Sequence, residues 1–262
     1  MGAGNANCWE TISFHDLKEI HRVCTSFVYR KENVLIGMNF DNDGKEFKIS
    51  TNLGHDFLVS VKVNRKYFPS IGINQKGVFV NDSLVDSNGE GKYKRQNDKR
   101  WVTTSLIRYS MGSDVELDNV KEVLRKVEVV NSPNASTHNL IVDPEGNTCV
   151  VEPGRKIIFS GVKDSEYCVV TNFPLSDYEE TTPVAVSGSG SDRYQKVLEK
   201  LAKFNYSMTV EQGFQILESV KQDGPEWTTQ LSMIYDGLNR KLFYCLDQKF
   251  DEIIEYDFQQ SI

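Results

Sequence analysis

Long apolar runs are absent from this sequence. No stretch reaches the roughly 20 consecutive apolar residues that a membrane-spanning helix needs, and residues 1–23 lack the continuous apolar segment of a secretory signal. An excess of positive charge is absent too, because 30 Lys and Arg residues stand against 37 Asp and Glu residues. This balance disfavours non-specific binding to nucleic acids and anionic lipids. We therefore expect a cytoplasmic protein without a membrane span and without a nucleic-acid partner. The basic run at 92–100 is the local exception and is expected to be a solvated loop.

Paired cysteines are missing as well. The five cysteines are odd in number and far apart in sequence: Cys8, Cys24, Cys149, Cys168 and Cys245. No Cys or His spacing is typical of a zinc site, and a disulfide framework is not expected in a cytosolic chain. Cys149, Cys168 and Cys245 lie inside apolar runs, which predicts buried core thiols. No metal or other cofactor is expected.

Short blocks of β-branched and aromatic residues separated by turn residues predict strands. The first group forms a run of antiparallel strands with Gly77 at a turn, and a second group predicts a second sheet with a hairpin turn at 144–147. A third group ends the chain, with a turn at 238–241. The predicted strands are 24–30, 33–40, 46–51, 57–63 and two within 71–81, then 138–143, 147–152, 156–161 and 167–171, and finally 229–236, 241–247 and 252–258.

Three amphipathic segments predict helices at 114–127, 192–204 and 209–220. Ser113 or Asp114 is the expected N-cap of the first, and Thr209 with Gln212 forms a capping-box pattern at the third. Groups of strands alternating with groups of helices predict an α+β fold, in which two antiparallel sheets pack face to face under outer helices. We expect one domain over residues 24–262.

A catalytic role for Cys24 requires a base. The four histidines, His15, His21, His55 and His138, stand in no motif that marks one, so each is expected to be structural or exposed. Cleavage of the peptide bond before Cys24 offers another base, because the new α-amine would titrate near about 7.7 and could accept the thiol proton.

The ordered motifs from Cys24 onward resemble the choloylglycine hydrolase and penicillin V acylase family. They read CTSFVYRKENVLIGMNFD, GINQKG, HNLIVDPEGNTCVVEPG, VVTNFP, SGSDRYQKV and TTQLSMIYDGLNRKLFY. The resemblance implies a linear amide C-N hydrolase of the N-terminal nucleophile superfamily with a four-layer αββα sandwich. It implies a small N-acyl amide as substrate, and autocatalytic removal of a leader, residues 1–23, between Val23 and Cys24.

The same resemblance implies the roles of five residues. Cys24 matches the nucleophile, and Asp41 matches the aspartate that holds its amine. Asn172 matches the asparagine whose amide helps to form the oxyanion hole, and Arg193 matches an active-site arginine. Asn81 lies near the position whose backbone N–H supplies the second oxyanion donor.

Two features depart from the family pattern. Met38 occupies a position where family members usually have an arginine, and a thioether cannot lower the pKa of a nearby thiol as a cation does. The interval from Asn172 to Arg193 is too short for the insertion associated with the family tetramer, so a homo-oligomer would be of another kind. Two alternatives therefore accompany the amidase prediction. One is an acyltransferase that uses the same thioester, and the other is a binding homologue with impaired catalysis.

Overall fold

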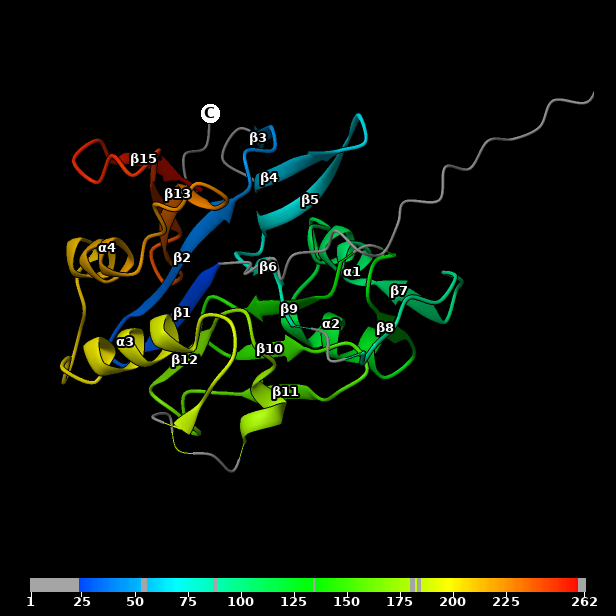
Figure 1. The fold of residues 1–262 in the computed structure, drawn as a ribbon. Coiled ribbons are helices and arrows are strands. Elements are labelled where there is room, and N and C mark those ends of the chain that lie inside the picture. The colour runs from blue at the N-terminus through cyan, green and yellow to red at the C-terminus, as the bar shows by residue number, and fades with distance from the viewer. Residues whose placement is uncertain are drawn as a thin grey trace, which may run out of the picture.

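Two large antiparallel sheets lie face to face and carry helices on their outer surfaces (Figure 1). The computed structural model describes residues 24–52, 56–86, 89–133, 135–179, 182 and 185–258. The predicted leader, residues 1–23, and the side chain of His55 lie outside the described residues. Among the residues that are described, no helix is both long and apolar enough to cross a membrane.

The first sheet has six strands in the order β12-β1-β2-β13-β14-β15. Its strands are β1 (Thr25–Arg30), β2 (Val34–Asn42), β12 (Tyr167–Val170), β13 (Thr228–Asp236), β14 (Lys241–Leu246) and β15 (Ile254–Asp257). The second sheet has seven strands in the order β11-β10-β9-β6-β5-β4-β3. Its strands are β3 (Phe47–Asn52), β4 (Asp56–Val63), β5 (Lys66–Ile73), β6 (Phe79–Leu84), β9 (Thr137–Val142), β10 (Thr148–Val151) and β11 (Ile157–Ser160).

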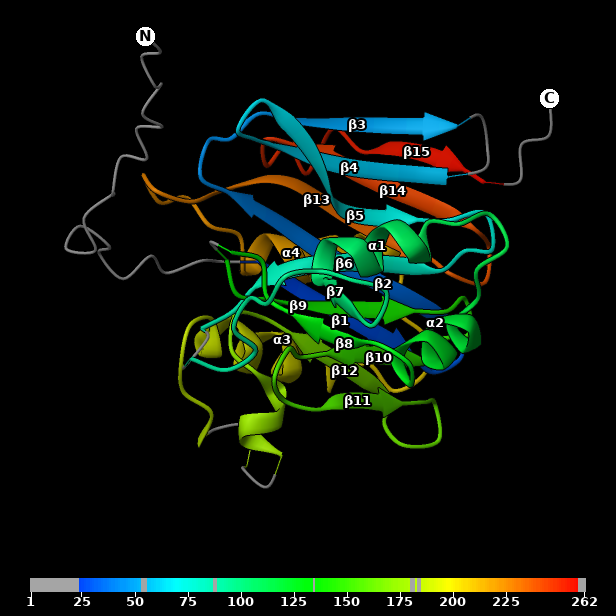
Figure 2. The ribbon, with the colours of Figure 1, turned by 90° about the vertical axis from the view of Figure 1, so that its right-hand side faces the viewer.

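The helices form the two outer layers. Figure 2 shows α1 and α2 in front of the seven-stranded sheet, with α3 and α4 behind the other sheet. Their bounds are α1 (Thr103–Ser110), α2 (Leu117–Leu124), α3 (Ser191–Leu201) and α4 (Val210–Ser219). A short parallel pair, β7 (Arg100–Val102) and β8 (Glu128–Val130), and a 3-10 turn, η1 (Leu175–Tyr178), complete the described elements. The predicted αββα sandwich is thus confirmed.

Strands β1 and β2 are buried on both faces, because each separates two hydrophobic layers. Phe27 and Tyr29 contact the helix layer of α3 and α4, whereas Val28 points between the sheets. Gly37 on β2 leaves room for Phe27, since a Cβ there would meet the Phe27 ring at 2.3 Å. Burial of two faces explains why these segments read as nearly continuous apolar runs.

The predicted grouping of strands was wrong in two places. The chain leaves the first sheet after β2, so β3 to β6 lie in the same sheet as β9 to β11 instead of continuing β1 and β2. Strand β12 returns to the first sheet, where it pairs with β1. Alternation along a strand shows which side chains share a face, but it does not identify the neighbouring strand.

Both helices on the six-stranded sheet, α3 and α4, were predicted. On the seven-stranded sheet α2 was predicted and α1 was not. The segment predicted as helix 114–127 forms α2 over Leu117–Leu124 only, and its N-cap is Glu116 instead of Ser113 or Asp114. Helix α1 was missed because its eight residues include two threonines and two serines, which are weak helix formers. Cys149 and Cys245 are buried as predicted, whereas Cys168 is only partly buried.

Candidate active site

Cys24 stands directly before β1, with its thiol against the end of the adjacent strand. In the β1–β2 hairpin, Thr25 lies opposite Asn39. This register brings Asp41, near the end of β2, beside Cys24, and the Cys24 Sγ lies 3.8 Å from the backbone oxygen of Asp41. Both residues are buried. These two predicted site residues therefore come together because Cys24 directly precedes the first strand of one hairpin and Asp41 lies on the second.

Asn172 reaches Cys24 from the other neighbour of β1. Strand β12 places Val170 opposite Ser26, so Asn172 lies just beyond the strand end, beside Cys24. The Cys24 backbone N–H donates to Asn172 Oδ1 at 2.9 Å, and Asn172 Nδ2 donates to the backbone oxygen of Leu84 at 2.6 Å. Leu84 ends β6 in the opposite sheet, so the Asn172 amide connects the two sheets at the site.

Arg193 enters the site from the first turn of α3. Its Nη1 donates to the Cys24 backbone oxygen at 2.8 Å and to Thr25 Oγ1 at 2.6 Å, and its Nη2 donates to Asn172 Oδ1 at 2.9 Å. The residue before the helix is Gly190, with φ 77°. A Cβ at Gly190 would lie 2.4 Å from Arg193 Nη2. Glycine is therefore needed here both for the positive φ and for the space that the guanidinium occupies.

Asp41 has one oxygen paired and one without a partner. Thr229 on β13 lies opposite Asp41 in the sheet, and its Oγ1 donates to Asp41 Oδ1 at 2.5 Å. Asp41 Oδ2 is buried without a hydrogen-bond partner among the described residues. Sequence reasoning did not assign Thr229 a role, although it lies in the quoted TTQLSMIYD motif, because its pairing with Asp41 spans 188 residues.

Asn81 lies close to the site, and the described hydrogen bonds of its side chain go to residues other than Cys24. From β6 its Nδ2 donates to Ser26 Oγ at 2.8 Å and contacts the buried Met38 Sδ at 3.3 Å. Its Oδ1 accepts the Leu140 N–H. The part of this segment that lies against Asn172 is Leu84, three residues farther along. Met38 thus lies in the apolar core between the sheets, where its sulfur contacts the uncharged amide of Asn81.

The electrostatics of the site follow from burial. Burial and the nearby Asp41 carboxylate raise the pKa of the Cys24 thiol to about 12. Burial likewise raises the pKa of Asp41 to about 8, although the Thr229 hydrogen bond and the Arg193 charge act to lower it. Burial lowers the pKa of Arg193 from its ordinary value. In a chain still joined at residue 23, the Cys24 thiol therefore stays protonated at neutral pH. The pKa of the Asp41 carboxyl, by contrast, lies close to neutral pH.

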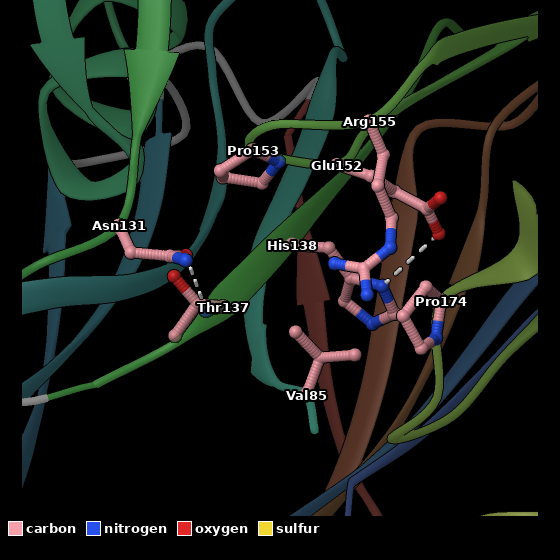
Figure 3. A pocket seen from close by; sticks show the side chains of 8 residues that line it. All are labelled: Val85, Asn131, Thr137, His138, Glu152, Pro153, Arg155 and Pro174. Carbon is pink, nitrogen blue, oxygen red and sulfur yellow. Dashed lines mark hydrogen bonds and ion pairs between the residues drawn. The ribbon is translucent and has the colours of Figure 1, made fainter. Parts of the chain in front are cut away.

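His138 and Glu152 form a buried pair behind Thr171, and sequence reasoning assigned the pair no role. His138 Nε2 lies 2.9 Å from the Thr171 backbone oxygen, and His138 Nδ1 lies 3.6 Å from Glu152 Oε1. Figure 3 shows the two side chains facing each other beside a small cavity, with Pro174 next to them. The sequence could have indicated this pair, because an imidazole and a carboxylate inside apolar strand runs are expected to be buried, and such groups are buried only with partners.

Comparison with known families gives a match over residues 59–183. The matching model describes linear amide C-N hydrolases of the choloylglycine hydrolase family. The matched range contains Asn81 and Asn172, whereas Cys24, Asp41 and Arg193 lie outside it. No curated protein matches the chain in sequence.

Solved structures match the fold at low sequence identity. A mutant of conjugated bile acid hydrolase from Clostridium perfringens has a TM-score of 0.64 at 15% identity, covering 89% of this chain and 92% of its own. Penicillin V acylase from Agrobacterium tumefaciens has a TM-score of 0.65 at 16% identity, covering 89% and 86%. An N-acylethanolamine-hydrolyzing acid amidase ortholog from Caenorhabditis elegans has a TM-score of 0.53 at 12% identity, covering 82% and 93%. The four-layer sandwich is therefore shared with these enzymes over most of the chain.

Proposed function

We propose that this chain is a self-processed cysteine amidase of the choloylglycine hydrolase family of linear amide C-N hydrolases, the family whose model matches residues 59–183. In this proposal residues 1–23 are a leader, and residues 24–262 are the mature domain. Cys24 attacks the amide of a small N-acyl amine and forms a thioester, which water then hydrolyses.

The observation that carries the proposal is the arrangement around Cys24. Its backbone N–H, backbone oxygen and thiol each meet one of three predicted residues: Asn172, Arg193 and Asp41. These residues come from three different elements, so the contacts depend on the whole fold and not on one local turn. A buried cysteine with only a structural role would not need its main-chain atoms held by an asparagine and an arginine side chain.

Removal of the leader would supply the base for turnover. The thiol pKa of about 12 in the uncut chain leaves almost no thiolate at neutral pH. Cleavage before Cys24 converts its amide into an α-amine with an ordinary pKa of about 7.7, which can accept the thiol proton. The unpartnered Asp41 Oδ2 is the acceptor that such an amine would find nearby.

The cleavage itself follows the same chemistry. Cys24 Sγ attacks the carbonyl carbon of Val23 while a base takes the thiol proton, and Asp41, with a pKa of about 8, is suited to that step. The C–N bond between Val23 and Cys24 then breaks, the nitrogen takes up a proton, and a thioester joins the leader to Sγ. Water hydrolyses this thioester, which releases the leader with a carboxylate and leaves Cys24 with a free amine and a free thiol.

Asn172 and Arg193 would act together during turnover. Asn172 Oδ1 accepts from Cys24 and from Arg193, so the amide is oriented with Nδ2 on its other side. From there Nδ2 can donate to the developing oxyanion, a contribution whose loss typically costs about 10²–10³ in kcat. The second donor in this proposal is the backbone N–H at or near Asn81.

The test begins with intact mass. We expect the wild-type chain to lose residues 1–23 while the Cys24→Ala chain keeps them. The processed protein is then offered a series of N-acyl-7-amino-4-methylcoumarin amides that differ in acyl length. Fluorophore release by wild type and none by Cys24→Ala is the expected result. Added free amines that capture the acyl group faster than water does would identify an acyltransferase instead. Retention of the leader, together with no turnover after cleavage by an added protease, would contradict the proposal.

A further inference from the structure

The buried pair of His138 and Glu152 contacts the segment that carries Asn172 on both sides. Before Asn172, the Thr171 backbone oxygen lies 2.9 Å from His138 Nε2. A carbonyl oxygen has no hydrogen to donate, so Nε2 must carry the proton of this bond. After Asn172, the Glu152 carboxylate accepts three hydrogen bonds, from the Leu175 N–H at 2.6 Å, the Ser176 N–H at 3.1 Å and the Ser176 hydroxyl at 2.5 Å.

The two side chains also lie next to each other. His138 Nδ1 lies 3.6 Å from Glu152 Oε1, and both side chains are at most 2% exposed. Burial acts to raise the pKa of Glu152, but its contacts with His138 and Ser176 outweigh burial and leave that pKa below its ordinary value. Glu152 therefore remains a carboxylate at neutral pH and accepts the hydrogen bonds from Leu175 and Ser176. His138 lies on β9 and Glu152 directly follows β10, and Figure 3 shows Pro174 beside the two side chains.

These hydrogen bonds are more than is needed simply to connect β12 with η1. Residues 171–174 join β12 to η1, and connecting segments of this kind ordinarily run over the surface. Here a buried imidazole and a buried carboxylate from the opposite sheet fix both of its ends. Asn172 between them bonds Cys24 and Leu84, so a small shift of the loop would displace the amide from both partners.

We propose that His138 and Glu152 are positioning residues that fix the Asn172 amide for oxyanion binding. This inference rests on the proposed function, because it assigns the pair an effect on the reaction through Asn172. A misplacement of a catalytic group by about 1 Å can cost about 10²-fold in rate. We therefore expect His138→Leu to lower kcat by about 10–100-fold while KM changes by less than about threefold, since the lost interaction acts in the transition state.

A matched pair of substitutions separates positioning from general packing. His138→Gln keeps an N–H donor near the place of Nε2, so it is expected to retain kcat within about fivefold of wild type. Asn74→Ala is the control for lost stability, because Asn74 is a buried residue whose amide donates to the backbone oxygens of Ser110 and Val115 at 2.7 Å in the helix layer. It should lower the unfolding midpoint and leave kcat within about twofold of wild type.

The decisive measurement is a double-mutant cycle with Asn172→Ala. All chains carry a protease recognition sequence in place of residues 18–23, so that each is cut before Cys24 whether or not it processes itself, and intact mass verifies the cut. The acyl-aminomethylcoumarin amides are the probes. If His138 acts through Asn172, His138→Leu costs less than about threefold once Asn172 is alanine.

The outcomes are distinct. An equal loss from His138→Leu in both backgrounds, or no recovery in His138→Gln, would overturn the positioning role and leave the proposed function standing. A correctly cut wild-type chain that hydrolyses none of the amides would overturn the proposed function and this inference with it.

Discussion

Arg193 makes three of the hydrogen bonds at the site, to Cys24, Thr25 and Asn172. Arg193→Met would remove this donor from the Cys24 backbone oxygen and from Thr25 Oγ1, whereas Asn172 Oδ1 would keep the Cys24 N–H. Each buried acceptor left unsatisfied costs about 1–3 kcal/mol. Arg193→Lys keeps the charge but not the fork of donors. We expect leader removal to slow by at least about 10²-fold in Arg193→Met and less in Arg193→Lys, as measured by intact mass over time. Equal rates in the two variants would contradict the assigned geometry.

Thr229 offers a second prediction at the residue scale. Its hydroxyl donates to Asp41 and acts to lower the Asp41 pKa. Thr229→Val removes that bond, so the Asp41 pKa should rise further and the acidic limb of the pH–rate profile should move to higher pH. At pH 7 we expect about a tenfold lower rate of leader removal, equivalent to about one pKa unit. Thr229→Ser retains a hydroxyl and is the control. An unchanged profile in Thr229→Val would argue against a role for ionised Asp41.

The start of α3 matters at the scale of the element. Gly190 adopts a left-handed conformation immediately before the helix and leaves 2.4 Å between a hypothetical Cβ and Arg193 Nη2. Gly190→Ala therefore combines a backbone penalty of about 1 kcal/mol with displacement of the guanidinium. Gly44 has φ 80° with nothing within 4 Å of its Cβ position, so Gly44→Ala carries the backbone penalty alone.

These two glycine variants make a matched comparison. We expect similar losses of stability in urea unfolding, and a much larger loss of leader removal and turnover in Gly190→Ala, by at least about tenfold. The comparison uses the Cys24→Ala background for unfolding and the native cysteine for activity. Equal activities in the two variants would show that α3 can shift without displacing Arg193.

Buried carboxyl groups link pH to the stability of the whole molecule. In the uncut chain burial raises the pKa of Asp41 to about 8 and that of Asp82 to about 7, both from a reference value of 3.8. Between the reference pKa of 3.8 and the raised values, the folded state thus binds more protons than the unfolded state. The free energy of unfolding should therefore fall as pH rises from about 4 to about 8, which is the direction opposite to that of a salt-bridged aspartate.

The test uses the Cys24→Ala chain, which cannot process itself under the proposed mechanism. We expect its melting temperature to be lower at pH 8 than at pH 5 by at least about 3 °C, since 1 kcal/mol corresponds to about 2–4 °C in a chain of this size. Asp41→Asn in the same background removes one of the two groups and should flatten the dependence. A melting temperature that rises from pH 5 to pH 8 would contradict the assigned burial of these carboxyls.

Much of the fold and part of the site could be predicted before the structure. The strand and helix segments, the sandwich and the family resemblance follow from local periodicity and from ordered motifs. Cys24 and Asp41 lie within one hairpin, so their proximity follows from the turn between them. The contact of Asn172 and Arg193 with Cys24 was implied only by the resemblance, because 148 and 169 residues separate them from it.

The amino-acid sequence by itself determined which segments become strands, which faces are apolar and which residue types are available for chemistry. The tertiary structure alone decided that β12 joins β1, that Thr229 lies opposite Asp41, and that His138 and Glu152 hold the segment around Asn172. The physical reason is range. Side-chain alternation reports on neighbours two residues apart, whereas strand pairing and buried hydrogen bonds depend on how distant segments share one core.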